Sequence, residues 1–201
     1  MTEKRFTRSE VSIKYREIRH SEKGSELRWM VTQECFLDNK TGRTITRGLV
    51  RHPGICVIVP FTKDGGILLM RQYRFAVDED LWELPAGTME GREEDSRMVA
   101  IESAADSASR ELHEETGWVA GRIEKAGECY AIPGSGDELI NVFFAFDLVQ
   151  KEQMLEEGEI ISEVVDFSLA QIEEMIDRGQ IRDAKTLVAL FLALRKKRNA
   201  N

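Results

Sequence analysis

The stretch that decides the fold of this chain reads Arg110-Glu111-Leu112-His113-Glu114-Glu115-Thr116-Gly117. It places three carboxylates within five residues, near the end of a segment with helical periodicity. On an α-helix, Glu111 lies on the same face as Glu114 and Glu115. Two carboxylates about 6 Å apart repel by about 3 kcal/mol at an effective dielectric near 20. A divalent cation would reverse that repulsion, and Mg²⁺ prefers carboxylate oxygen. The cluster therefore predicts a metal site, with an acidic, solvent-facing helix end as the alternative.

The segments around this cluster set the expected geometry of the site. An apolar stripe predicts a helix from Ile101 to its C-terminal cap at Gly117. The polar residues 88–100 are expected to form a loop, preceded by a strand and a turn at Leu84-Pro85-Ala86-Gly87. If that turn folds back over the helix, the carbonyl of Ala86 can join the carboxylates as an oxygen ligand. Arg110 either orients a carboxylate or forms an ordinary intrahelical ion pair with Glu114.

The composition limits the class of protein. With 201 residues, 42% of them hydrophobic and 32% charged, the chain is long and apolar enough for one ordinary domain with a small addition. A net charge of −8 argues against a protein that coats nucleic acid. The three cysteines are scattered, which favours buried free thiols in a reducing compartment. The longest apolar run, Leu187 to Leu194, is too short to span a bilayer. We expect a cytoplasmic protein with no membrane and no nucleic-acid partner.

The pattern of strands and helices predicts a mixed α/β (α+β) fold. Residues 27–36 and 44–50 are β-prone and joined by turn residues, so they should form a hairpin. Two strands alone bury too little to be stable, so this hairpin should pack on another part of the protein, such as a second subunit. A capping box at Ser168 predicts a helix that ends at Gly179. The other expected elements are strands at 55–61, 67–73, 82–87, 126–131, 139–148 and 160–167, and a helix at 183–197.

These residues resemble the Nudix box, in which Gly, five residues, Glu and seven residues precede Arg-Glu-apolar-x-Glu-Glu-x-Gly-apolar. Residues 110–118 match its C-terminal part in full, and Leu84–Gly87 resembles its entry turn. The spacing between the halves departs from the pattern. Glu93 follows Gly87 at the first interval, but sixteen residues instead of seven then precede Arg110. Glu102 has the expected spacing to Arg110, so we infer a nine-residue insertion and prefer Glu102 as the first Glu of the box, with Glu93 as runner-up.

Over nearly the whole chain, the sequence is similar to the ADP-ribose pyrophosphatase branch of that family. The resemblance implies an α/β/α sandwich with a mixed sheet over residues 52–201, and a small N-terminal β subdomain over residues 1–51 that forms a domain-swapped homodimer. The segments that carry it, beside the box, are Arg51–Gly54, Arg71–Arg74, Trp82–Gly87, Pro133–Glu138 and Ile181–Thr186.

The resemblance also implies a reaction: metal-dependent hydrolysis of ADP-ribose, or a related nucleoside diphosphate sugar, to a nucleoside monophosphate and a sugar phosphate. Glu111 and Glu115, helped by Glu114 and the Ala86 carbonyl, would hold Mg²⁺, or alternatively Mn²⁺. Arg110 and Glu114 join the catalytic set. A carboxylate from the acidic loop at 156–159 would act as the base, and Glu157 and Glu159 both remain candidates.

The expected substrate contacts come from three segments. Arg71 and Arg74 are candidates because Arg pairs with phosphate through two hydrogen bonds. Strand alternation sends them to opposite faces, so only one should reach the substrate, and surface solvation is the alternative for either. Glu83, Asp137 and Glu138 complete the set, although turn chemistry also accounts for the last two. The competing functions are hydrolysis of another nucleotide (GDP-mannose, UDP-glucose or an oxidised nucleotide) and nucleotide binding with impaired turnover.

Overall fold

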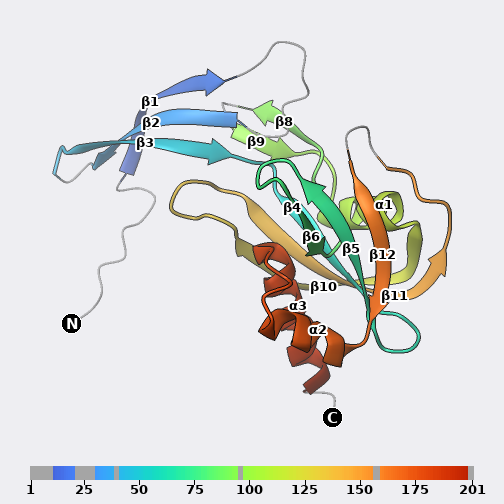
Figure 1. The fold of residues 1–201 in the computed structure, drawn as a ribbon. Coiled ribbons are helices and arrows are strands. Elements are labelled where there is room, and N and C mark those ends of the chain that lie inside the picture. The colour runs from blue at the N-terminus through green and yellow to red at the C-terminus, as the bar shows by residue number, and fades with distance from the viewer. Residues whose placement is uncertain (1–10, 21–29, 39–40, 95–96, 156–158, 199–201) are drawn as a thin grey trace.

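The structure is a computed structural model that describes residues 11–20, 30–38, 41–94, 97–155 and 159–198 (Figure 1). Its first half contains strands β1 Val11–His20, β2 Met30–Asp38, β3 Thr44–Arg51, β4 Ile55–Pro60, β5 Ile67–Arg74, β6 Glu79–Glu83, β7 Ala86–Thr88, β8 Gly91–Glu94 and β9 Arg97–Ala100. Its second half contains helix α1 Ala104–Thr116, strands β10 Trp118–Tyr130, β11 Leu139–Gln150 and β12 Ile161–Phe167, and helices α2 Leu169–Asp177 and α3 Ala184–Arg198.

Two sheets form the centre of the molecule. One has the strand order β10-β11-β4-β7, in which β11 and β4 run parallel and the other pairs are antiparallel. The other has the order β12-β5-β6 and is antiparallel throughout. Every residue of β4 is buried, because this apolar run has layers of structure on both faces. Successive residues point to opposite faces, so Val57 packs in one apolar cluster and Ile58 in the other.

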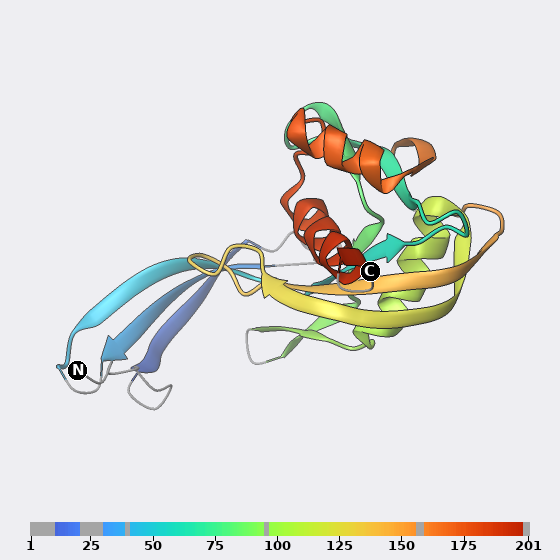
Figure 2. The ribbon, with the colours of Figure 1, turned by 90° about the horizontal axis from the view of Figure 1, so that it is seen from below.

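Helices cover the two faces of this centre. Ala108 and Leu112 of α1 pack against one face, and α2 and α3 pack against the other through Ile172 and Leu190. Figures 1 and 2 show α1 on one side of the strands and α3 on the other. Helix α1 begins after Ser103, whose side chain accepts the Asp106 N–H, and ends at Gly117, which has a left-handed φ of 70°. The predicted fold class, an α/β/α sandwich with a mixed sheet, is confirmed.

The N-terminal sheet, β1-β2-β3, projects away from this body (Figure 2). The predicted hairpin corresponds to β2 and β3, and β1 adds a third strand, which pairs with β2. The connection between β10 and β11 reaches toward the base of the projecting sheet (Figure 2). There Val50 forms a parallel bridge with Gly136, and its N–H donates to the carbonyl of Ser135 at 2.8 Å.

Two expectations about the insertion were wrong. Residues 88–100 do not form a plain loop, because β8 and β9 pair as an antiparallel hairpin (Figure 1). Helix α1 begins at Ala104 rather than Ile101, because Ser103 caps it, and Ile101 is 56% exposed. The Ile101 N–H instead donates to the carbonyl of Glu90 at 2.8 Å and closes the base of the hairpin.

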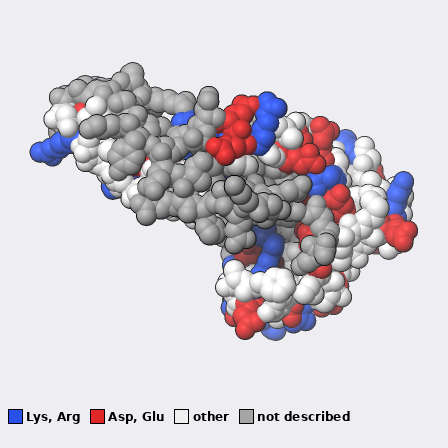
Figure 3. All heavy atoms as spheres, turned by 90° about the horizontal axis from the view of Figure 1, so that it is seen from above, with Lys and Arg blue, Asp and Glu red and all other residues white. Residues whose placement is uncertain are grey.

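The cysteines, the helix lengths and the surface charge complete the description of the fold. Cys35 and Cys56 are buried free thiols, and Cys129 is half-buried and free. In the part of the chain that the structure describes, no helix is both long and apolar enough to cross a membrane. On the face shown in Figure 3, acidic and basic side chains are interspersed among neutral ones over the described residues.

Candidate active site

The last two turns of α1 carry two buried carboxylates. Glu111 is 4% exposed and Glu115 is 1% exposed. The N–H of Ala86, in the turn that leads into β7, donates to Glu115 Oε2 at 2.7 Å. A Cβ on Gly87 would lie closer than 3.0 Å to all three atoms of the Glu111 carboxylate. The entry turn therefore folds back onto the helix, and Gly87 lacks a side chain where Glu111 requires the space.

Arg110 organises the carboxylates around it. Its Nη1 lies 2.9 Å from both Glu111 Oε1 and Glu114 Oε2, and its Nη2 lies 3.2 Å from Glu102 Oε1. Burial opposes the charge on Arg110, but the attraction of Glu111 and the hydrogen bonds that Arg110 donates to Glu102 and Glu114 outweigh it and raise the pKa of Arg110. The same Glu102 oxygen accepts the Glu90 N–H at 2.6 Å. The contact with Arg110 supports Glu102 as the first Glu of the box, whereas Glu93 is exposed on β8.

Glu115 is the most strongly perturbed group of the site. Burial raises its pKa well above the ordinary carboxyl value, and the nearby charges of Glu111 and Glu159 raise it further. The Ala86 hydrogen bond and the charge of Arg74 act in the opposite direction but are outweighed. A buried carboxyl in this environment is protonated more readily than usual, and a cation that displaced the proton would relieve the repulsion from Glu111.

The donor set fits a hard divalent cation through a pair of carboxylates. Among the described residues, no three His, Cys, Asp or Glu side chains are grouped closely enough to hold a metal ion together. Glu111 and Glu115 nevertheless meet at the backbone of Ala86 and Gly87, where Gly87 leaves room for the Glu111 carboxylate. One or two carboxylates are sufficient for Mg²⁺, which keeps several of its waters and takes further ligands from substrate phosphates.

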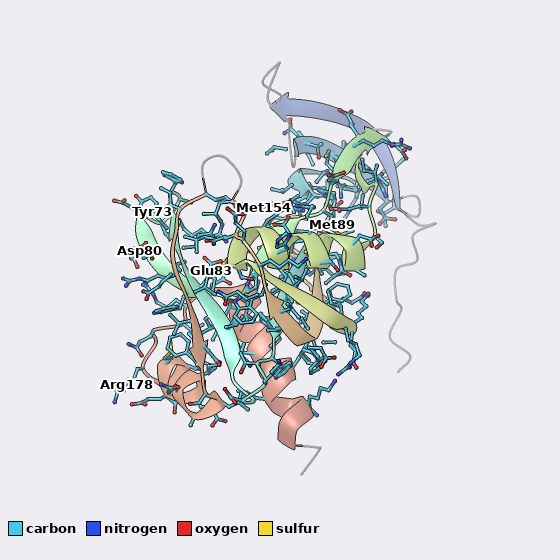
Figure 4. All side chains as sticks on the ribbon, turned by 90° about the vertical axis from the view of Figure 1, so that its right-hand side faces the viewer. Tyr73, Asp80, Glu83, Met89, Met154 and Arg178 are labelled. Carbon is cyan, nitrogen blue, oxygen red and sulfur yellow. The ribbon has the colours of Figure 1, made fainter. Side chains whose placement is uncertain are left out.

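The loop that precedes β12 is anchored to the end of α1. The Lys151 N–H donates to the Gly117 carbonyl at 2.7 Å, and the Met154 N–H donates to the Glu114 carbonyl at 3.1 Å. Figure 4 shows Met154 beside α1. At the far end of the loop, the Tyr73 N–H donates to the Ile160 carbonyl at 3.0 Å. Glu159 is close enough to raise the pKa of Glu115. Glu157 lies outside the described residues.

A cavity of about 530 Å³ adjoins this site. Ala86 and Gly87 form the part of its wall nearest the α1 carboxylates. Arg74 and Lys185 contribute positive charge to another part. The remaining wall combines the polar side chains of His52 and Glu138 with the apolar surfaces of Tyr130, Ile132 and Val188. The cavity thus has a basic wall, which also includes Asp183, and an apolar wall, and its edge at Ala86 and Gly87 adjoins the α1 carboxylates.

The basic wall is held by Glu83, which is fully buried. Glu83 accepts two hydrogen bonds from Arg74, at 2.8 and 2.7 Å, and also pairs with Lys185. Asp183 lies 3.0 Å from Lys185 Nζ. Burial opposes the charge on Arg74, but the hydrogen bonds and attraction of Glu83 raise its pKa above the ordinary value. Figure 4 shows Glu83 in the interior between the sheet and the helices.

The comparisons with known proteins agree with this geometry. A family model described as "NUDIX domain" matches residues 50–190. An ADP-ribose pyrophosphatase of Bacillus subtilis is 32% identical over 151 residues, covering 74% of this chain and 76% of the relative. The chain belongs to the Nudix family. Within that family it falls in the ADP-ribose pyrophosphatase-like branch, so it is an enzyme, a Nudix pyrophosphohydrolase.

Two further comparisons place this Nudix chain among its relatives. A methanol dehydrogenase activator of Bacillus methanolicus is also 32% identical over 151 residues, with 74% of this chain and 76% of the relative covered. A crystal structure of an ADP compounds hydrolase superposes with a TM-score of 0.77 at 21% identity, over 96% of both chains. At that identity the superposition shows the shared fold.

Some of the predicted substrate-binding residues line the cavity of this Nudix protein, and others pair with residues outside it. Arg74 and Glu138 line the cavity, and Glu83 stands behind Arg74. Arg71 is 44% exposed and pairs instead with Asp80 and Glu163 on the outer side of β5. Asp137 is engaged with the N-terminal part of the chain: its carboxylate accepts the His52 N–H and pairs with Arg51, both at 2.9 Å.

Most of the cavity-lining residues were missed by the sequence analysis, including His52, Lys185 and Tyr130. His52 and Lys185 lie inside segments that carried the family resemblance, but nothing in their spacing distinguished them from structural residues. Tyr130 is 59% exposed, and the strand pattern around it gave no reason to place an aromatic side chain at a cavity. Burial and the charge of neighbouring strands determine these roles, and neither is visible in the sequence.

Proposed function

We propose that this Nudix enzyme hydrolyses the diphosphate bond of ADP-ribose, or of a related nucleoside diphosphate sugar, and releases a nucleoside monophosphate and a sugar phosphate. The observation that carries the proposal is the juxtaposition of Glu111 and Glu115 with a cavity that has one basic and one apolar wall. A diphosphate needs the cation and the basic wall, while a base or sugar needs apolar and polar surface beyond it. The named relative in Bacillus subtilis supports ADP-ribose as the first substrate to test.

Glu111, Glu115 and the backbone at Ala86 would hold Mg²⁺, with Mn²⁺ as the alternative and Glu114 as an additional ligand. When bound, the cation neutralises the diphosphate and lowers the pKa of a coordinated water. Arg110 keeps the carboxylates in place through its contacts with Glu111 and Glu114. The chain's own contribution is thus to hold two mutually repelling carboxylates at the edge of the cavity.

A carboxylate of the loop before β12 would take the proton from the attacking water. Glu159 is the candidate among the described residues, and its charge, which raises the pKa of Glu115, supports this role beside the proposed metal ligands. Glu157 remains the other candidate. The anchoring of this loop to the end of α1 at Gly117 and Glu114 supports a role beside the metal site.

Arg74 and Lys185 would face the phosphates from the basic wall. Glu83 already holds the charged side chains of Arg74 and Lys185 in place, so they lose little conformational entropy when they bind a phosphate. Tyr130 and Ile132 would contact a planar base or a sugar.

We also propose that residues 1–51 form a subdomain that pairs with a second copy of the chain, because the N-terminal sheet projects from the body. We further propose that the enzyme works in the cytoplasm.

A substrate panel tests the proposal. Purified protein is incubated with Mg²⁺ or Mn²⁺ and with ADP-ribose, GDP-mannose, UDP-glucose or a diadenosine polyphosphate, and the released phosphomonoester is measured. We expect metal-dependent turnover with ADP-ribose among the best substrates. Binding without turnover on every substrate would refute the proposed activity.

Two variants test the metal assignment. Glu115→Gln should lower kcat by about 10²-fold or more, because the electrostatic contribution of a catalytic metal is lost. Glu174→Gln on the exposed surface of α2 is the matched control and should leave turnover unchanged. Unchanged turnover in Glu115→Gln would show that the metal is bound elsewhere. Sedimentation of the active protein as a monomer would contradict the proposed dimer.

A further inference from the structure

Arg51, at the end of β3, joins the N-terminal sheet to the cavity wall. Its Nε and Nη2 donate to Glu34 Oε1 of β2, at 2.9 and 2.7 Å, and its Nη1 donates to Asp137 Oδ2 at 2.9 Å. Glu34 is completely buried, and the Arg51 side chain is only 12% exposed. The Arg51 guanidinium is therefore held in one orientation: two of its nitrogens bind Glu34 on β2, and the third binds Asp137 on the connection between β10 and β11.

The backbone reinforces the same junction. Asp137 N–H donates to the Val50 carbonyl at 3.2 Å, and Val50 N–H donates to the Ser135 carbonyl at 2.8 Å. The other carboxylate oxygen of Asp137, Oδ1, accepts the His52 N–H at 2.9 Å. One carboxylate thus fixes both the connection that contains it and the segment that follows β3.

Both of these segments form the cavity wall. Ile132 and Glu138 come from the connection, and His52 comes from the segment after β3. The Gly54 N–H donates to His52 Nδ1 at 3.1 Å, so the proton of the neutral ring is on Nε2. Burial lowers the pKa of His52, although Glu138 and Asp137 act to raise it. The ring is therefore held as a neutral donor in a fixed orientation.

The catalytic carboxylates have independent support. Glu111 is held by Arg110, and Glu115 by the Ala86 N–H. The side-chain hydrogen bonds described above for Arg51 and Asp137 go instead to Glu34, to each other and to the His52 N–H. Loss of the Arg51–Asp137 pair should consequently disturb one wall of the cavity and leave the metal-binding end of the site intact.

We propose that Asp137 is a positioning residue, through which Arg51 and the N-terminal sheet set the affinity of the cavity for substrate. It acts by fixing His52 and the 131–138 connection, and it does not itself contact the substrate. This inference rests on the proposed function and deepens it, because it assigns substrate affinity and turnover to different parts of the structure.

Two conservative variants test the inference in the full chain with Mg²⁺ and ADP-ribose. Asp137→Asn can still accept the His52 N–H, but its amide nitrogen cannot pair with Arg51. Arg51→Lys keeps the charge beside the buried Glu34 but lacks the second arm needed to reach Asp137. Each should raise KM about tenfold, as expected for the loss of one charge-assisted hydrogen bond, and change kcat by less than about threefold. Asp64→Asn and Arg178→Lys, both on exposed surface, are the matched controls.

The double variant separates positioning from direct contact. If Asp137 acts only through the pair, Arg51→Lys/Asp137→Asn should raise KM no further than either single variant. A raised KM in Asp137→Asn with normal KM in Arg51→Lys would show direct substrate contact and overturn the proposal. A lower melting temperature with unchanged KM in both single variants would show a merely structural role and also overturn it.

A binding measurement keeps this test independent of turnover. Calorimetric titration of ADP-ribose should show about tenfold weaker binding to each single variant than to the wild type. If the wild type binds but does not hydrolyse any substrate, the proposed function fails while the positioning inference is still tested by these dissociation constants. Equal affinity in wild type and variants would refute the inference whatever the turnover.

Discussion

Gly87→Ala is the sharpest test of how the entry turn and α1 fit together. The added methyl would lie closer than 3.0 Å to every atom of the Glu111 carboxylate, a separation that real Cβ atoms do not show. The carboxylate is the end of a flexible side chain, so it can move aside more easily than the backbone can. Because Glu111 is buried and paired with Arg110, that movement takes it away from the position in which it would bind metal.

The size of the effect follows from this displacement. Restoring ordinary van der Waals separation requires a shift of about 1.5 Å, and a misplacement of even about 1 Å can cost about 10²-fold in rate. This corresponds to about 2.7 kcal/mol in the activation free energy. The folded state should lose about 1–2 kcal/mol from overpacking, which leaves the protein folded at 25 °C. We therefore expect a folded enzyme with kcat lowered about 100-fold.

Steady-state kinetics with ADP-ribose and Mg²⁺, together with thermal melting, check this expectation. Gly48→Ala is the matched control, because a Cβ there meets no atom within 4 Å. The control should keep wild-type activity, and Gly87→Ala should also show a smaller Mg²⁺-induced rise in melting temperature. Wild-type turnover and an unchanged Mg²⁺ response in Gly87→Ala would refute the assignment of Glu111 to the metal site.

Three further outcomes are expected. The pKa of Glu115 is raised in the metal-free native state. The protonated Glu115 carboxyl therefore stabilises the fold fully below the unfolded-state pKa near 4.3, and this stabilisation is lost as the pH rises through the raised native-state pKa. Melting curves should therefore show a larger gain from Mg²⁺ at pH 8.5 than at pH 5.5, and Glu115→Gln should flatten this pH dependence. Glu83→Gln should lower the free energy of unfolding in urea by about 2–3 kcal/mol, since Lys185 loses its buried partner. Burial raises the pKa of Cys56 to about 12, so mass spectrometry after iodoacetamide treatment of the native protein at pH 8 should find Cys129 alkylated before Cys56.

Local features of the fold could be predicted where the local sequence pattern favours the same conformation that the tertiary structure adopts. The buried strand at 55–60, the capping box at Ser168 and the cap at Gly117 each follow from local chemistry that the fold retains. The spacing of the box revealed the insertion, but its hairpin was not predicted, because every residue of β8 is exposed and neither short strand has a strong β pattern. Its base is held by a contact of Glu90 with the distant Glu102.

In the candidate site, too, the local arrangement could be predicted from the sequence and the long-range pairing could not. The spacing of Arg110, Glu111 and Glu115 placed the carboxylates on one helix, and helical geometry is local. For Asp137, substrate contact and turn chemistry were both open from the sequence, and the pairing with Arg51, 86 residues earlier in the chain, was not expected. A pairing across that separation depends on how the N-terminal sheet and the β10–β11 connection pack, which no local pattern encodes.

The sequence by itself determined the family, the helix that carries the carboxylates and the turn that faces it, because these depend on residue type and short-range spacing. Only the tertiary structure decided which charges line the cavity. Arg74 and Lys185 share Glu83 at the basic wall, Arg71 turns outward, and Asp137 is used to hold the wall in place. The physical reason is that burial and pairing between distant segments set the role of a charged side chain, and both exist only once the chain has folded.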